Sequence, residues 1–281
     1  MNTIYQSPIC KLTELKDIFI ELTSKNCNLR CRQCYIDFPI TKNVKDFIKQ
    51  DTVKQALADL NNNNLRCIYL TGAEPMTHPD FNSILRLCIK TSNVCICTNA
   101  SFINEKKARF LKGVETASNH NIMFKLSFTH WDEIKNDNVR SRGAYRQNIY
   151  ALKCLDKYGF TNIITVSNYY KEPHNKIVDE FGKKLSDMGI DNAVIKVNEW
   201  CFNNNNSVEV QDNISLSTDC MTSRTLTENG IFSCPFLAND YRGRMGSNFS
   251  NFSDTTRLET SYCEACIKNK DKMFTVELDE F

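Results

Sequence analysis

Three cysteines stand close together near the beginning of the chain, in the stretch "SKNCNLRCRQCY" at 24–35. Cys27, Cys31 and Cys34 follow the spacing C-x3-C-x2-C, and no histidine lies beside them in the sequence. Cysteine thiolates bind zinc and hold iron–sulfur clusters. A structural zinc ion requires four ligands, whereas three thiolates on a four-iron cluster leave one iron open to an exchangeable ligand. The spacing therefore favours a cluster with one open iron over zinc.

A second group of cysteines lies near the end of the chain, with the spacing C-x13-C-x28-C-x2-C. The surrounding residues, 214–281, are rich in turns and poor in apolar periodicity, so we expect this part to need a bound metal for its stability. Four thiolates fit a structural zinc ion, and they also fit a closed iron–sulfur cluster. The members of this group are Cys220, Cys234, Cys263 and Cys266.

The composition argues against a nucleic-acid or membrane surface. The 281 residues are 41% hydrophobic and 24% charged, and the net charge of +2 is too close to neutral for such a surface. No apolar run approaches the roughly 20 residues that span a bilayer, and "MNTIYQSPICKLTELKD" does not have the pattern of a signal peptide. Fourteen cysteines would suit a secreted disulfide protein, but such proteins are short and loop-rich. We therefore expect a cytoplasmic metalloprotein with reduced thiols.

Alternating strands and helices must position the first cysteine group. Strands are predicted at 17–23, 65–71, 94–99, 122–129, 162–168 and 192–200. Helices are predicted at 52–63, 81–92, 104–118, 145–159 and 176–189. This α/β pattern indicates a parallel sheet with right-handed crossovers, either open and doubly wound or a barrel of fewer than eight units. The cysteines follow the first strand at its carboxyl end, where α/β proteins assemble their sites.

The first cysteine group, followed by the aromatic Tyr35, resembles the signature of the radical S-adenosylmethionine (SAM) enzymes. The resemblance covers about residues 17–198 and implies a partial (β/α)6 TIM-like barrel. It implies that Cys27, Cys31 and Cys34 hold a [4Fe–4S] cluster whose open iron binds the amine and carboxylate of SAM. In that family an electron, supplied by a donor such as flavodoxin or ferredoxin, cleaves SAM. The resulting 5′-deoxyadenosyl radical abstracts a hydrogen atom from the substrate.

Four further stretches resemble elements of the same family, in the same order. They are "TGAEPMTHPDF" (71–81), with Ala73 where the family has a second glycine, "CTNA" (97–100), "KLSFTH" (125–130) and "RSRGAY" (140–145). The resemblance implies that SAM is bound by Gly72, Glu74, Asn99, Ser127 and Arg140. Structural alternatives stay open: a solvated loop residue for Glu74, a helix cap for Asn99, a plain strand residue for Ser127 and a surface position for Arg140.

The stretch "ENGIFSCPF", with Gly230 four positions before Cys234, resembles the auxiliary-cluster extension called Twitch, which is related to the longer SPASM domain. The resemblance implies that the four C-terminal cysteines close an auxiliary [4Fe–4S] cluster, and a four-thiolate zinc site is the alternative. It divides the chain into an N-terminal extension (1–16), a radical SAM barrel (17–200) and an auxiliary-cluster domain (201–281).

The resemblance also implies an activity, namely the modification of a ribosomally made peptide by epimerisation or cross-linking. With only about 16 residues before the first strand, a peptide would be read by the barrel mouth and the C-terminal part. Cys201 follows the last predicted strand, and a thiol there could return a hydrogen atom to a carbon radical, as epimerisation requires; a structural thiol is the alternative. Two other functions stay open. One is an epimerase or dehydrogenase of an aminosugar or other small metabolite, and the other is a non-catalytic iron–sulfur or zinc sensor.

Overall fold

The predicted parallel strands are all present. The structure is a computed structural model that describes residues 8–36, 46–60, 64–190, 193–199, 218–268 and 273–276. The strands are β2 (Asp17–Thr23), β3 (Cys67–Gly72), β4 (Asn93–Thr98), β5 (Ile122–Phe128), β6 (Thr161–Asn168) and β7 (Ala193–Glu199). Each pairs in parallel with the next in chain order. Their carboxyl ends therefore meet at one edge of the sheet, as the α/β pattern predicts.

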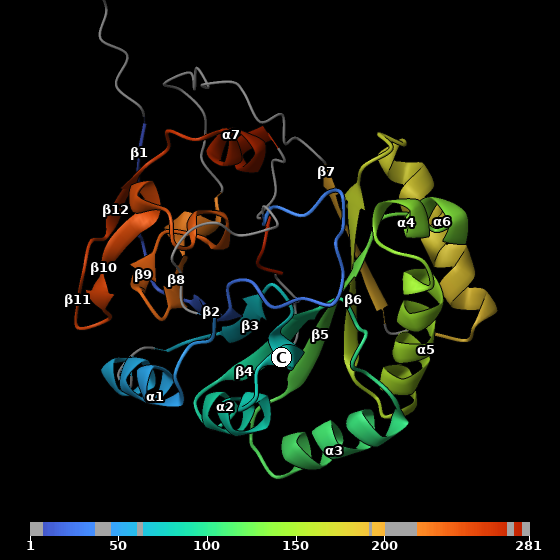
Figure 1. The fold of residues 1–281 in the computed structure, drawn as a ribbon, viewed down its shortest axis with the longest axis horizontal. Coiled ribbons are helices and arrows are strands. Elements are labelled where there is room, and N and C mark those ends of the chain that lie inside the picture. The colour runs from blue at the N-terminus through green and yellow to red at the C-terminus, as the bar shows by residue number, and fades with distance from the viewer. Residues whose placement is uncertain are drawn as a thin grey trace, which may run out of the picture.

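Helices connect these strands and cover one side of the sheet (Figure 1). They are α1 (Gln50–Asp59), α2 (Phe81–Cys88), α3 (Glu105–Thr116), α4 (Glu133–Val139), α5 (Ala144–Lys157) and α6 (His174–Asp187), with a short 3-10 turn η1 (Pro75–Thr77). Helix α4 was not predicted, because it is short and its apolar Ile134 is 72% exposed. Its start is nevertheless encoded locally, since the Asp132 side chain accepts a 2.9 Å hydrogen bond from the backbone N–H of Lys135.

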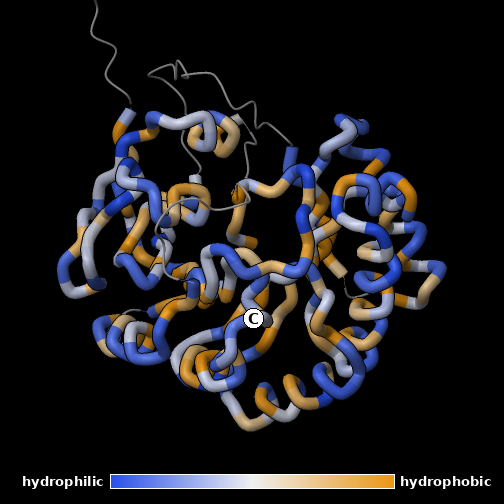
Figure 2. Tube along the Cα trace, in the orientation of Figure 1, coloured by the Kyte–Doolittle hydropathy of each residue, from blue (hydrophilic) through white to orange (hydrophobic). Residues whose placement is uncertain are grey.

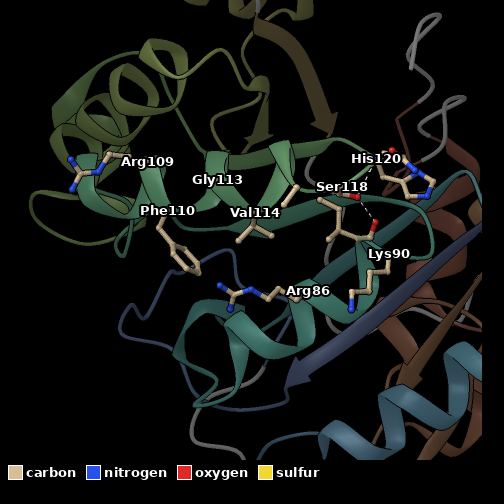
Figure 3. A pocket seen from close by; sticks show the side chains of 11 residues that line it. Arg86, Lys90, Arg109, Phe110, Gly113, Val114, Ser118 and His120 are labelled. Carbon is tan, nitrogen blue, oxygen red and sulfur yellow. Dashed lines mark hydrogen bonds between the residues drawn. The ribbon is translucent and has the colours of Figure 1, made fainter.

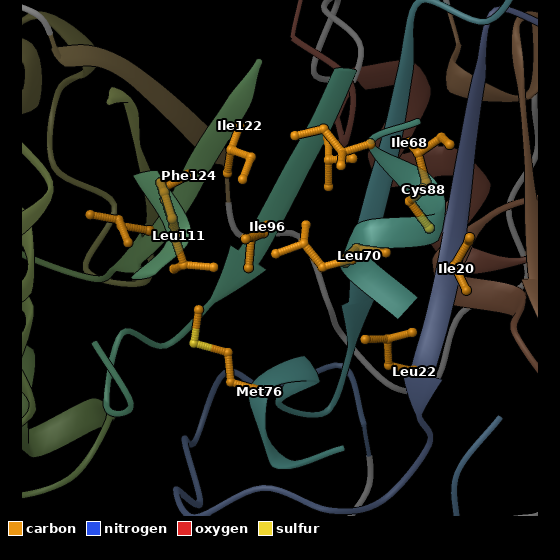
Figure 4. Packing of buried hydrophobic residues seen from close by; sticks show 14 of the residues in the cluster. Ile20, Leu22, Ile68, Leu70, Met76, Cys88, Ile96, Leu111, Ile122 and Phe124 are labelled. Carbon is orange, nitrogen blue, oxygen red and sulfur yellow. The ribbon is translucent and has the colours of Figure 1, made fainter. Parts of the chain in front are cut away.

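Alternation along the strands separates a large outer core from a small inner one. On β2, Ile18, Ile20 and Leu22 pack in the outer core beneath the helices, whereas Phe19 belongs to the inner cluster. This two-fold alternation is the ordinary consequence of strand geometry. Figure 4 shows the outer core between the strands and α2 and α3. Hydrophobic residues follow the central strands and alternate with hydrophilic ones along the helices (Figure 2).

The C-terminal residues extend the same sheet. Strand β8 pairs in parallel with β2, with Asp17 opposite Ser223, and β9, β10 and β11 follow in antiparallel order to complete a sheet of ten strands in the described ranges. Leu226, Ile231 and Phe249 pack in the outer core. The 201–281 boundary stays a prediction, but the described part of this region shares a sheet and a core with the barrel. Its elements are η2 (Asp219–Met221), β8 (Ser223–Thr227), β9 (Gly230–Phe232), η3 (Pro235–Leu237), η4 (Tyr241–Gly243), β10 (Arg244–Asn248), β11 (Asn251–Phe252), β12 (Thr255–Arg257) and α7 (Ser261–Lys268).

The helices are short by comparison with a bilayer. In the described part of the chain, α5 and α6 are the longest at 14 residues each. A membrane-spanning helix needs about 20 residues. No helix within the described ranges combines the length and the apolarity that crossing a membrane demands.

The joint between β2 and the C-terminal region contains a buried carboxyl group, Glu21, which accepts a 2.7 Å hydrogen bond from Asn239. Burial raises the pKa of Glu21 to about 7 from the ordinary 4.5. Because the fold favours the protonated form, stability is lost as the pH rises from about 5 through 7. The free energy of unfolding should fall by up to about 3 kcal/mol over this pH range because of Glu21, and Glu21→Gln should abolish that decrease. Urea denaturation at several pH values measures it.

The matched control for this experiment is Glu259→Gln, at an exposed position. Its pH profile should run parallel to that of the unaltered protein. If Glu21→Gln also ran parallel, the ionisation of Glu21 would play no part in stability.

Candidate active site

The carboxyl ends of the parallel strands open on a cavity of about 220 Å³. Its wall contains residues from β2 through β7, from the cysteine loop and from the C-terminal region. All but one of the predicted barrel-site residues lie on this wall: Cys27, Cys31, Cys34, Gly72, Asn99, Ser127 and Arg140. The exception is Glu74, which lies behind it.

The cysteine loop is tied at both ends. Where it leaves β2, the backbone N–H of Asn26 donates to the Thr23 hydroxyl at 3.1 Å. Further along, the backbone N–H of Arg32 donates to the carbonyl oxygen of Val139 at 2.8 Å. The loop is thereby held between the end of β2 and the end of α4. These contacts orient its three thiols toward the cavity.

The three thiols are half-buried and close enough to influence one another. Burial raises the pKa of each, and that of Cys34 reaches about 11, partly because charge on Cys31 and Cys27 would repel its own. Thiols must be deprotonated to bind a metal. Positive charge must therefore accompany ligation, and both iron and the guanidinium of Arg140 supply it. The donor set fits a group held by three thiolates.

Arg140 is buried, so the surface alternative for it is wrong. It is 2% exposed and donates a hydrogen bond from Nη1 to the carbonyl oxygen of Ser127. Its Nε atom is also buried and finds no hydrogen-bond partner among the described residues. A buried cation with an unused donor beside three thiols suits an anionic ligand, either the thiolates themselves or a carboxylate.

Asn99 contacts the cysteine loop directly. Its Nδ2 atom lies 2.9 Å from the Asn28 side-chain oxygen and 3.5 Å from the sulfur of Cys27. The alternative that Asn99 caps the next helix is wrong, because the cap of α3 is Asn104, whose side chain accepts from the N–H of Lys107 at 2.9 Å. Asn99 is therefore free of that structural duty and faces the cavity.

Glu74 is fully buried and holds the loop after β3 in place. Its carboxylate accepts hydrogen bonds from the Thr98 hydroxyl at 2.8 Å, the Asn99 N–H at 2.8 Å and the Met76 N–H at 3.1 Å. Burial raises its pKa to about 7, and these hydrogen bonds oppose the rise. The solvated-loop alternative is therefore wrong. A SAM-binding role for Glu74 stays a prediction, and its contacts support an indirect one.

The structure adds Lys125, Met273 and Phe274 to the cavity wall, and the motifs assign no role to them. Lys125, only 7% exposed, donates from Nζ to the carbonyl oxygen of Phe274 at 2.6 Å. Asp219 accepts from the N–H groups of Met273 at 2.7 Å and Phe274 at 2.9 Å. A lysine in the apolar strand "IMFKLSF" was a usable signal. Residues 273–276 carry no such signal, because only the fold brings them into the barrel.

The four C-terminal thiols also come together. Cys220 and Cys263 pack in one buried cluster. Burial raises the pKa of Cys234 and of Cys266, and charge on Cys263 would raise both further, so the four thiols are close enough to interact. Within the described ranges, no three Cys, His, Asp or Glu side chains surround one point as a single ion requires. A four-iron cluster binds each thiolate to a different iron, so it needs thiols around a shared space.

Two features lie outside this site. A hollow of about 650 Å³ lies between α2 and α3, near the amino ends of β4 and β5, with Arg86 over the Phe110 ring at 5.0 Å (Figure 3). It is remote from the cysteine loop, which follows the carboxyl end of β2. The predicted hydrogen donor, Cys201, lies outside the described residues.

The fold and the cysteine loop together define the class of protein. Residues 22–181 match the radical SAM superfamily. The match covers more than half of the chain, and the chain belongs to this superfamily.

Particular relatives agree. A cysteine-type anaerobic sulfatase-maturating enzyme of Clostridium novyi (strain NT) is 28% identical over 187 residues, which cover 59% of this chain and 48% of the relative. The chain thus spans about half the length of the curated relative it matches. The structure of Streptococcus suis SuiB bound to S-adenosylmethionine has a TM-score of 0.63 at 15% identity, over 82% of this chain and 62% of that one. Native anSMEcpe with bound AdoMet has a TM-score of 0.64 at 13% identity, over 84% and 78%. The partial-barrel fold is confirmed.

Gly72 permits the close approach of the loop after β3 to β2. Its φ is +122°, and a Cβ there would lie 2.2 Å from the carbonyl oxygen of Thr23. Gly72→Ala should therefore lower the free energy of unfolding by more than about 2 kcal/mol. Gly113→Ala is the control, because nothing lies within 4 Å of that helical position; it should stabilise by about 0.5–1 kcal/mol. Equal urea midpoints for the two variants would contradict this account.

Proposed function

We propose that this radical SAM enzyme modifies a ribosomally made peptide by epimerisation or cross-linking. The observation that supports this proposal most directly is that Cys27, Cys31 and Cys34 share one cavity with Asn99 and Arg140. When bound, the cluster and SAM supply a 5′-deoxyadenosyl radical able to abstract hydrogen from an unactivated C–H bond. The protein's own part is to hold both groups and to position the target bond while excluding water.

Seven of the wall residues have a role in this proposal. The three cysteines hold the cluster, and the backbone at Gly72 approaches SAM closely because it has no side chain. Arg140, with its unused buried donor, suits the SAM carboxylate. Ser127 and Asn99 offer polar groups to the rest of SAM. An external electron donor such as flavodoxin or ferredoxin completes the proposal.

The barrel interior favours a peptide over a sugar. Two side chains inside it, and Asp219 beside it, already bind the backbone of residues 273–276. Lys125 and Lys196 donate to carbonyl oxygens of this stretch at 2.6 Å and 2.7 Å, and Asp219 accepts from its N–H groups. Such groups suit the backbone of a substrate peptide equally well. A solved structure similar to this chain, native anSMEcpe, carries bound AdoMet and a Cp18Cys peptide, with a TM-score of 0.64 at 13% identity.

We further propose that the four C-terminal cysteines hold an auxiliary [4Fe–4S] cluster. Four thiolates close such a cluster, which suits electron transfer or structural support. Their proximity to one another supports this role. Iron and sulfide analysis distinguishes it from the zinc alternative.

The radical chemistry is testable without a peptide. After anaerobic reconstitution, SAM and dithionite should give 5′-deoxyadenosine, and Cys31→Ala should lower its release at least 100-fold, because two thiolates no longer hold the cluster. Cys88→Ala, at a fully buried thiol of the outer core, is the control and should keep the activity. Absence of 5′-deoxyadenosine from the unaltered protein would favour the non-catalytic sensor.

Epimerisation and cross-linking are distinguished by hydrogen return. Given a peptide that raises 5′-deoxyadenosine release, an epimerase working in D2O should place one deuterium on the inverted carbon, because a thiol exchanges with solvent. Cys201→Ala should abolish this label. A product two hydrogens lighter, with no deuterium and no dependence on Cys201, would identify cross-linking by mass spectrometry.

A further inference from the structure

A fifth cysteine lies against the C-terminal thiols. Cys10 sits on β1 (Ile9–Lys11), which runs antiparallel to β12 beside it (Figure 1). It packs in one cluster with Cys220 and Cys263. More than 200 residues separate Cys10 from Cys220 in the sequence, so no spacing pattern connects them. The contact exists only in the fold.

In the register of β1, the Cys10 thiol faces inward and the larger apolar side chain of Ile9 faces outward. Cys10 is 2% exposed, whereas Ile9 beside it is 59% exposed. Successive strand residues face opposite sides, so a shift by one position would bury the isoleucine instead. Burial of apolar area alone would favour that shift. The observed register therefore places the Cys10 thiol, and not the isoleucine, beside the C-terminal thiols.

Cys10 and Cys220 are direct neighbours. They belong to one buried cluster, and each Sγ lies 3.6 Å from the hydroxyl oxygen of Thr218. A [4Fe–4S] cluster binds each thiolate to a different iron and so holds its thiolates well beyond contact distance. Two thiols that share the Thr218 hydroxyl as a partner are placed for either one to approach the same iron.

The surroundings of this pair suit an anionic metal group. Arg224 is fully buried and donates to the carbonyl oxygens of Cys220 at 2.6 Å and Asp254 at 2.9 Å. In the described part of the chain, its Nε atom and the buried hydroxyl of Thr256, directly opposite Cys10, have no hydrogen-bond partner. A buried cation needs negative charge nearby, and thiolates on iron provide it.

We propose that Cys10 and Cys220 are alternative ligands for one iron of the auxiliary cluster. Cys234, Cys263 and Cys266 bind the other three irons. The inference rests on the auxiliary cluster of the proposed function. It makes the N-terminal strand part of the metal site, and the thiol that is not bound to iron stays beside the Thr218 hydroxyl.

The auxiliary cluster is measured alone in the 281-residue chain that carries Cys27→Ala, Cys31→Ala and Cys34→Ala. In this parent, Cys10→Ala and Cys220→Ala are made singly and together, then reconstituted anaerobically with iron and sulfide. The parent and both single variants should retain about four irons per chain. The reduced cluster should give a shifted electron paramagnetic resonance spectrum in at least one single variant. The double variant leaves three thiolates and one iron without a cysteine ligand, so it should either lose iron or give a spectrum that differs from those of the parent and of both single variants.

Two control variants are made in the same parent, one that removes a proposed ligand and one that removes an unrelated thiol. Cys234→Ala removes a ligand without an alternative and should lose iron or alter the spectrum, whereas Cys154→Ala, at a buried thiol of α5, should change neither. The double serine variant, Cys10→Ser with Cys220→Ser, preserves side-chain volume, and circular dichroism confirms its fold. This variant should show lost iron or an altered spectrum.

Three outcomes overturn the proposal. Loss of iron in either single variant shows that the thiols do not replace one another. Full iron and an unaltered spectrum in a folded double variant show that neither thiol is a ligand. A parent that binds no iron removes the auxiliary cluster of the proposed function as well, so the two failures are distinguishable.

Discussion

One buried carboxylate, Glu74, holds the active-site edge of the barrel together. Its oxygens accept from Thr98 and Asn99 at the end of β4, while its own backbone N–H donates to the carbonyl oxygen of Asn26 in the cysteine loop at 3.0 Å. Three segments that follow β2, β3 and β4 are thereby joined at one residue. A fully buried carboxyl group is tolerable only when its hydrogen-bonding capacity is used in this way. The positions of the first thiol and of Asn99 both depend on this joint.

Local periodicity was sufficient to predict the barrel strands, but not to predict the pairing of β8 or helix α4. The strands from β2 to β7 have alternating or continuous apolar runs, which sequence alone reveals. The parallel pairing of β8 with β2 could not be predicted, since it joins Asp17 to Ser223 across the whole barrel sequence. Helix α4 escaped prediction for the opposite reason: it is local but too short to show a period.

The same division applies to the site. The cysteine loop and the residues that follow each strand were predictable, because parallel strands deliver their carboxyl ends to one edge. The alternatives at Glu74, Asn99 and Arg140 could be decided only from burial and hydrogen bonds. Cys10 and residues 273–276 were beyond reach, since nothing in a sequence shows which distant segments share a space.

The N-terminal and the C-terminal group of cysteines each lie beside a buried arginine. Arg140 lies beside the first and Arg224 beside the second, and within the described ranges each guanidinium is buried with an Nε atom that has no hydrogen-bond partner. With protonated thiols, each site contains a desolvated cation without full compensation, which is costly. Thiolates bound to iron reverse this balance, because their negative charge stabilises the arginine while the arginine stabilises them. If both groups of thiols bind iron as proposed, folding and metal binding are coupled at both sites, and the apoprotein is the less stable state.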